Sequence, residues 1–91
     1  MSYIKQENRI YMQDEEGKLV AEITFEEIDN GVFEINHTFV DESLRGQGIA
    51  SKLVEAAVQE IEVRGGKVTA SCSYASKWLE KQRRKTNEQK Q

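Results

Sequence analysis

Apolar and polar side chains alternate along the first forty residues of the chain. The alternation covers residues 9–13, 19–26 and 32–40, and a glycine-containing turn signal lies in each interval between these segments. A period of two residues is typical of a strand with one buried face, and short glycine-containing intervals join such strands into hairpins. We therefore expect an antiparallel meander of three strands.

The third strand carries its apolar residues at odd positions. Phe33, Ile35, His37 and Phe39 fall on one face if the strand is regular. This spacing places the lone histidine of the chain on the apolar face of the meander.

The period of the pattern changes after Asp41. Apolar residues recur at helical spacing over residues 48–64, with polar residues mainly on the opposite side. Gly65 and Gly66 follow as a stop signal for this helix. The apolar positions of the predicted helix are Ala50, Leu53, Val54, Ala57, Val58 and Ile61.

A short strand and a second helix complete the pattern. Residues 67–72 alternate again and end at Cys72, and Ser73 can cap the helix that follows. From position 83 onward no side chain is apolar. We therefore expect residues 1–82 to form one domain and residues 83–91 to form a frayed or disordered basic tail.

The resulting element order is β-β-β-α-β-α. A unit of strand, helix and strand makes its two strands parallel, with a right-handed crossover. The sequence thus predicts a single α/β domain with a mixed four-stranded sheet and two helices.

Composition narrows the function classes. The chain has 91 residues, one cysteine and one histidine, which argues against a second domain, a disulfide scaffold and a multi-histidine metal site. No apolar stretch approaches the roughly 18 residues of a membrane span. Residues 1–72 hold seven basic and fourteen acidic side chains, unlike the basic face of a nucleic-acid binder. We expect a monomeric, cytoplasmic protein with a reduced thiol and with no metal, membrane or nucleic-acid partner.

One segment leaves a predicted strand and enters a predicted helix, and its sequence is Leu44-Arg45-Gly46-Gln47-Gly48-Ile49-Ala50-Ser51-Lys52. Glycines let a backbone approach a ligand closely, and the first amides of a helix lie unpaired at the positive end of its dipole. This combination predicts an anion site that would suit phosphate. A Walker A motif does not fit, because Ser51 and Lys52 stand in the reverse order. A Rossmann fingerprint fits poorly, because Ser51 stands where a third glycine or alanine is needed.

A third interpretation fits this loop. Residues 45–50 resemble the [Q/R]-x-x-G-x-[G/A] pyrophosphate loop of the GNAT superfamily of acyl-CoA-dependent N-acetyltransferases, with Arg45 in the first position, Gly48 in the fourth and Ala50 in the sixth. The surrounding order of elements is similar too, so the resemblance covers about residues 8–82. The chain looks most like very small GNAT-like N-acetyltransferases, which share its segments His37-Thr38 and Cys72-Ser73-Tyr74.

The resemblance implies a site for acetyl-CoA. Arg45 and the backbone amides of the loop would hold the pyrophosphate. Phe39 and Val40 would pair with the pantetheine arm, with the Val40 amide facing the thioester carbonyl. Tyr74 would line the pantetheine slot, although packing would explain it equally well. The amides in question belong to Gly46, Gln47, Gly48, Ile49, Ala50 and Ser51.

Cys72 and His37 are the candidate catalytic residues. Cys72 follows a strand and precedes a helix, which favours a thiolate, and it is either an acyl-accepting nucleophile or a small buried hydrophobe. His37 is either a core histidine or a general base that acts on the amine or on Cys72. Glu34 and Asp41 are alternative bases, or else ordinary solvated carboxylates.

The chain departs from larger GNAT enzymes around the acceptor. The connection at residues 26–31 is too short for the helices that those enzymes have there, and no strand signal follows the last helix. We therefore expect an acetyl-CoA-dependent N-acetyltransferase whose acceptor is an amine of unknown identity. Its acidic composition would tolerate a small basic amine or a lysine-bearing peptide. The alternative is a non-catalytic module that binds acyl-CoA.

Overall fold

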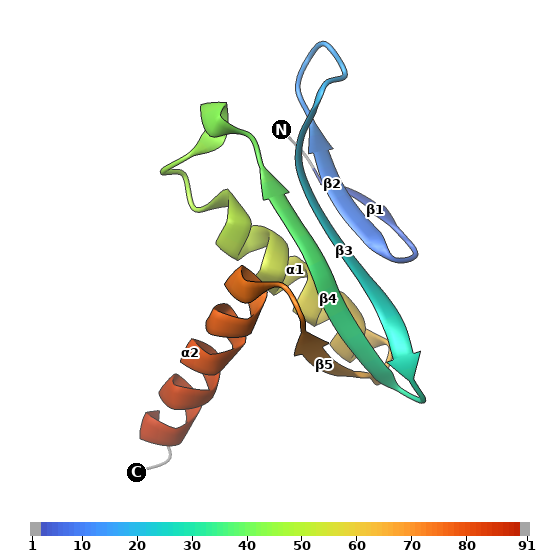
Figure 1. The fold of residues 1–91 in the computed structure, drawn as a ribbon, viewed down its shortest axis with the longest axis vertical. Helices are drawn as coiled ribbons and strands as arrows, with labels where there is room; N and C mark the ends of the chain where they lie inside the picture. The colour runs from blue at the N-terminus through green and yellow to red at the C-terminus, as the bar shows by residue number, and fades with distance from the viewer. Residues whose placement is uncertain (1–2, 90–91) are drawn as a thin grey trace.

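The computed structural model describes residues 3–89, which form one sheet, two α-helices and one short 3-10 helix (Figure 1). The chain starts with strands β1 (Ile4–Gln6), β2 (Arg9–Gln13), β3 (Leu19–Asp29) and β4 (Val32–Val40). The 3-10 helix η1 (Glu42–Leu44), helix α1 (Ile49–Val63), strand β5 (Lys67–Ala70) and helix α2 (Ser73–Gln89) follow.

The strands lie in the sheet in their order along the chain. Strands β1 to β4 are antiparallel neighbours, and β5 is parallel to β4. The expected mixed sheet is confirmed, but it has five strands rather than four. The additional strand β1 is only three residues long and none of its residues is buried, so it has no buried face that would produce an alternating pattern.

A β-bulge interrupts β4 at Asn36. Thr24 of β3 pairs with His37, whereas the next residue, Phe25, pairs with Ile35. Asn36 is therefore one extra residue in β4, and an extra residue reverses the faces on which the following side chains lie.

The bulge divides β4 into two parts of opposite phase. Before it, Phe33 and Ile35 are buried in the core. After it, His37 and Phe39 are exposed, and Thr38 lies on the core side of the strand. The predicted common face of Phe33, Ile35, His37 and Phe39 is therefore wrong beyond Asn36.

The hydrophobic core fills the space between α1 and one face of the sheet, behind which α1 lies in Figure 1. Helix α1 occupies most of its predicted range. Its buried side chains are Ile49, Leu53, Val54, Ala57 and Ile61. Because these recur every three or four residues, one side of the helix packs on the sheet.

Helix α2 packs near the β5 edge and begins one residue earlier than its predicted cap implies. The Cys72 carbonyl accepts the Ser76 amide at 2.9 Å, so Cys72 rather than Ser73 is the N-cap. The helix continues to Gln89, so residues 83–89 are helical where we expected a frayed tail. Long polar side chains are good helix formers even without an apolar face. Positions 90 and 91 lie outside the described residues.

Candidate active site

Strands β4 and β5 pair over four residues each, from Val32 with Lys67 to Ile35 with Ala70. The Ile35 carbonyl then accepts the amide of Ser71 at 3.1 Å, and the chain turns into α2. Strand β4 continues to Val40. Over residues 3–89, the second half of β4 therefore has β3 on one side and no strand on the other.

The backbone amides of this unpaired half point in alternate directions. The Asp41 amide donates to the Val20 carbonyl at 2.8 Å, which fixes the phase of the alternation. Amides two residues apart in a strand point to the same side. The amides of Thr38 and Val40 therefore point away from β3, into the gap beyond the end of β5.

The loop after β4 is held by Asp41. Its carboxylate accepts the Ser43 hydroxyl at 2.6 Å and the Ser43 amide at 3.1 Å, and Lys18 lies 3.9 Å away. The hydrogen bonds from Ser43 lower the pKa of the Asp41 carboxyl below its usual value. Asp41 thus caps η1, and the lowered pKa makes it a poor proton acceptor at neutral pH.

The loop then enters α1 through Gly48, which has a φ of 70° and a ψ of 20°. This left-handed conformation is costly for residues with a side chain. The helical ladder starts with the Lys52 amide, which donates to the Gly48 carbonyl at 3.2 Å. The amides of the first helical turn precede that bond and have no intrahelical acceptor.

A depression of about 250 Å³ lies where this loop, the end of β4 and the start of α2 meet. Seven of the predicted site residues line it, together with Leu44. They are Val40, Arg45, Gly46, Gly48, Ile49, Ala50 and Tyr74. Residues that are 34 positions apart in the chain, Val40 and Tyr74, thus meet at one site.

Three predicted binding residues lie outside this lining. Gln47 is exposed in the loop, and Phe39 is partly exposed on the opposite face of β4. The Ser51 hydroxyl accepts the indole N–H of Trp78 at 2.9 Å, which ties α1 to α2. A larger cavity of about 510 Å³ lies between α1, β5 and α2, but none of the predicted binding residues lines it.

The thiol of Cys72 is partly buried and lies 3.6 Å from the Thr38 hydroxyl. Burial alone would raise the pKa of this thiol. Hydrogen bonds from the Ala75 amide, from Thr38 and from the Tyr74 amide outweigh burial and lower the pKa below its usual value. The N-terminus of α2 thus favours the thiolate, as the sequence predicts.

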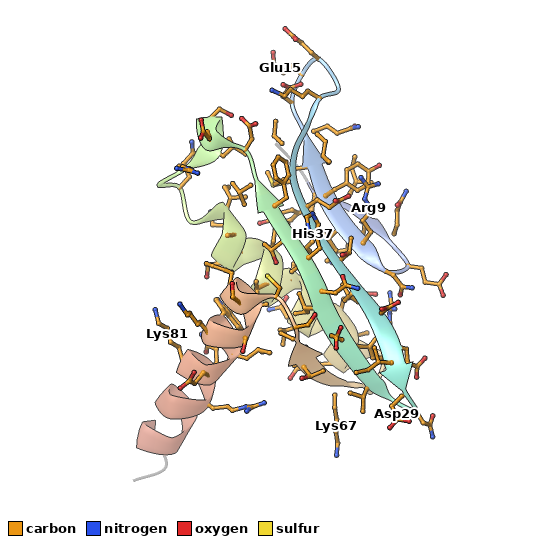
Figure 2. All side chains as sticks on the ribbon, viewed as in Figure 1. Arg9, Glu15, Asp29, His37, Lys67 and Lys81 are labelled. Atoms are coloured by element: carbon orange, nitrogen blue, oxygen red, sulfur yellow. The ribbon has the colours of Figure 1, made fainter. Side chains whose placement is uncertain are left out.

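His37 lies on the other face of β4, away from Cys72. Its Nε2 atom is 3.5 Å from the Glu22 carboxylate, which also pairs with Arg9. The Arg9 guanidinium lies 3.9 Å from the centre of the Tyr11 ring. Figure 2 shows Arg9 and His37 over the strands, on the side turned away from α1. The expectation that His37 lies on the apolar face is corrected, because the bulge turns the ring to the open face.

Two residues at this site, Thr38 and Glu22, are absent from the sequence-based set. The contact of Thr38 with Cys72 depends on the bulge at Asn36, for which the sequence carries no clear signal. The position of Glu22 beside His37 follows from the register of β3 and β4, which the hairpin alone leaves undetermined.

The remaining candidate base, Glu34, accepts the Ser71 hydroxyl at 3.1 Å. Within the described part of the chain, no three acidic, histidine or cysteine side chains gather as a metal site. None of the helices in the same part is long and apolar enough to cross a bilayer.

Several known structures have a similar fold. The solution structure of a "GCN5-like putative N-acetyltransferase" from Staphylococcus aureus matches with 40% identity and a TM-score of 0.74, over 89% of this chain and 79% of that one. An acetyltransferase from Bacillus cereus matches with 23% identity and a TM-score of 0.65, over 82% of this chain and 54% of that one. A ribosomal-protein-alanine N-acetyltransferase from Brucella melitensis matches with 23% identity and a TM-score of 0.59, over 70% and 49% of the two chains.

The last two likenesses concern the fold, and this chain spans about half the length of those two enzymes. No curated protein matches the sequence significantly. The sequence profile of the GCN5-related N-acetyl-transferase family, however, matches residues 9–88. The resemblance seen in the loop is thus confirmed, and the chain belongs to the GCN5-related N-acetyltransferase family of acyltransferases.

Proposed function

We propose that the protein transfers the acetyl group of acetyl-CoA to an amine that approaches from the open face of β4. The observation that carries this proposal is the meeting of the unpaired end of β4 with the glycine loop. Both sets of free backbone amides border one depression, whose lining includes Val40 and Gly48.

The donor would lie along these amides. The first turn of α1 offers unpaired N–H groups and a positive dipole end to the pyrophosphate, and Arg45 is exposed beside it. The amide-rich pantetheine arm would take the place of the missing neighbour of β4 and satisfy its backbone groups. The Val40 amide would then donate to the thioester oxygen, where negative charge develops during attack.

His37 would serve the acceptor. The amine must lose a proton before or during attack, and an exposed imidazole held beside Glu22 can accept it. The new N–C bond forms as the C–S bond breaks, and coenzyme A leaves as a thiolate. Because His37 occupies the open face, the acceptor amine would approach from that side.

Cys72 would act from the covered face of β4. Direct attack of the amine on the thioester suits the separation of His37 and Cys72 best. The Cys72 thiol would then give its own proton to the departing thiolate and be left as the thiolate that its hydrogen-bond donors favour. A covalent relay would instead transfer the acetyl group to the Cys72 sulfur first. A free thiol requires a reducing compartment, so the proposal includes a cytoplasmic location. It also includes a monomer, because one chain supplies the glycine loop, the unpaired end of β4, His37 and Cys72.

A backbone substitution tests the donor site. Gly48→Val places a branched side chain at the amides of the loop, so the affinity for acetyl-CoA, measured by calorimetry, should fall about 30-fold or more. Gly17→Val is the matched control, because Gly17 has a similar φ of 84° in the turn between β2 and β3 and an equally open Cβ position. If both variants bind acetyl-CoA equally well, the loop does not hold the donor.

Turnover with a panel of amines tests the enzyme itself. We expect steady release of free coenzyme A with at least one primary amine, and loss of that release in His37→Gln. Binding of acetyl-CoA without release for any amine would point to the non-catalytic module. For the relay, intact-mass spectrometry after incubation with acetyl-CoA should show one acetyl group that Cys72→Ala removes.

A further inference from the structure

We infer that Thr38, and not His37, is the side chain that orients the Cys72 thiol and supports its ionised form. The catalytic meaning of this role rests on the proposed function, but the contact itself does not. Thr38 is a positioning residue here, because it acts through Cys72 and does not touch the reacting atoms.

The bulge in β4 places the Thr38 side chain beside Cys72. Thr38 pairs with Ile23, a fully buried residue of the core face, so its side chain lies on that face. The hydroxyl lies 3.6 Å from the Cys72 sulfur, within hydrogen-bond distance for sulfur. If β4 alternated regularly through Asn36, this position would fall on the open face of the strand.

The Thr38 hydroxyl can form a hydrogen bond with both protonation states of the thiol. It can accept a hydrogen bond from the neutral thiol and donate one to the thiolate, so it remains a partner when Cys72 loses its proton. A hydrogen bond to the charged form favours that form. Threonine is also branched at Cβ, which restricts χ1 and keeps the hydroxyl in place.

The groups around the Cys72 thiol come from β4 and α2. Thr38 faces it from β4, and the amides of Tyr74 and Ala75 face it from α2. Among the described residues, no ionised side chain contributes to the lowered pKa of this thiol. The only side-chain group in the set is therefore the Thr38 hydroxyl.

The single cysteine of the chain gives a direct test. The rate of alkylation by iodoacetamide is measured on the full chain at about pH 7 and about pH 10, because only the thiolate reacts. Thr38→Val keeps the shape of the side chain and removes the hydroxyl. We expect about three- to tenfold slower alkylation at the lower pH and rates within about twofold of each other at the higher pH. A change in access alone would slow the reaction equally at both pH values.

Matched variants complete the experiment. Thr38→Ser keeps a hydroxyl and should stay within about twofold of the native rate. Thr69→Val makes the same change on β5, where no contact with Cys72 is seen among the described residues, and should leave the rate unchanged. His37→Gln should also leave it unchanged, because His37 lies on the other face.

The outcomes are distinct. A slow Thr38→Val variant with native-like Thr38→Ser and His37→Gln variants supports the inference. Equal rates for Thr38→Val and the native chain at the lower pH overturn it, as does a slow His37→Gln variant beside a normal Thr38→Val variant. None of these rates depends on acetyl transfer, so a failure of the proposed function would appear separately, in the turnover assay.

Discussion

The two faces of β4 beyond Asn36 surround their candidate catalytic residues with different groups. On the covered face, backbone amides and the Thr38 hydroxyl surround the partly buried thiol of Cys72. On the open face, the exposed ring of His37 lies beside the Glu22 carboxylate. Hydrogen-bonding dipoles thus favour the thiolate on one side, and a carboxylate lies beside the imidazole on the other.

Neighbouring residues of one strand can therefore act on opposite sides of one reaction. A regular strand would have placed His37 with the core residues before it. The bulge instead keeps the histidine accessible and sends the threonine to the thiol. His37 can therefore act on the acceptor amine from one face of β4, and Cys72 on the departing thiolate from the other.

Insertion of one alanine between His37 and Thr38 would reverse the two faces of the strand end. The inserted residue would take the place of Thr38 opposite Ile23, so Thr38 and the half-buried Val40 would exchange faces with Phe39. We expect the free energy of unfolding, measured with urea, to fall by about 2–4 kcal/mol, and acetyl transfer to be lost. Asn36→Ala, which keeps the chain length, should retain most of the stability. An insertion variant with native alkylation and turnover rates would contradict the role given to the phase of β4.

Glu22→Ala alters the open face alone. His37 loses its carboxylate neighbour, so we expect kcat to fall about tenfold with little change in the KM for acetyl-CoA. The alkylation rate of Cys72 should stay native, because the thiol lies across the strand. Glu26→Ala, at the next acidic open-face position of β3, is the control. A parallel loss of thiol reactivity in Glu22→Ala would show that the faces are coupled.

A smaller effect is expected beside the covered face, at the start of α2. Lys77 and Lys81 line a depression of about 150 Å³ that shares Tyr74 with the candidate site. Lys77→Glu should raise the KM for acetyl-CoA about three- to fivefold at low salt and less at high salt, because exposed charges are screened. Lys67→Glu, at the start of β5, makes the same charge change as a control. A salt-independent effect would argue against contact with phosphate.

The smallest effect is expected at acid pH, in the loop that follows β4. The Ser43 hydrogen bonds stabilise the ionised form of Asp41, so its pKa in the folded state lies below the ordinary value of 3.8. The contribution of this cap is present above that ordinary value and is lost as the pH falls through the lowered pKa. The NMR shift of the Ser43 amide should report the loss, and Asp41→Asn should remove the transition. An unchanged Ser43 shift across this range in the native chain would contradict the cap.

Much of this architecture could be predicted from the sequence. The alternation before Asp41, the helical period after it and the glycine loop reflect local physics, and the predicted site residues Val40, Gly48 and Tyr74 do meet. The bulge at Asn36 could not be predicted, because it depends on how two strands pair and not on either strand alone. The partners of His37 and Cys72 were therefore missed together.

The position of Cys72 as the N-cap of α2 has a consequence for the helix itself. The amides of Tyr74 and Ala75, which belong to the first helical turn, form hydrogen bonds with the sulfur. A thioester sulfur carries no charge and accepts hydrogen bonds weakly, so acylation would release these amides and loosen that turn. Hydrogen exchange at the two amides would therefore reveal the chemical state of the thiol, which makes the start of α2 a built-in reporter of what Cys72 carries.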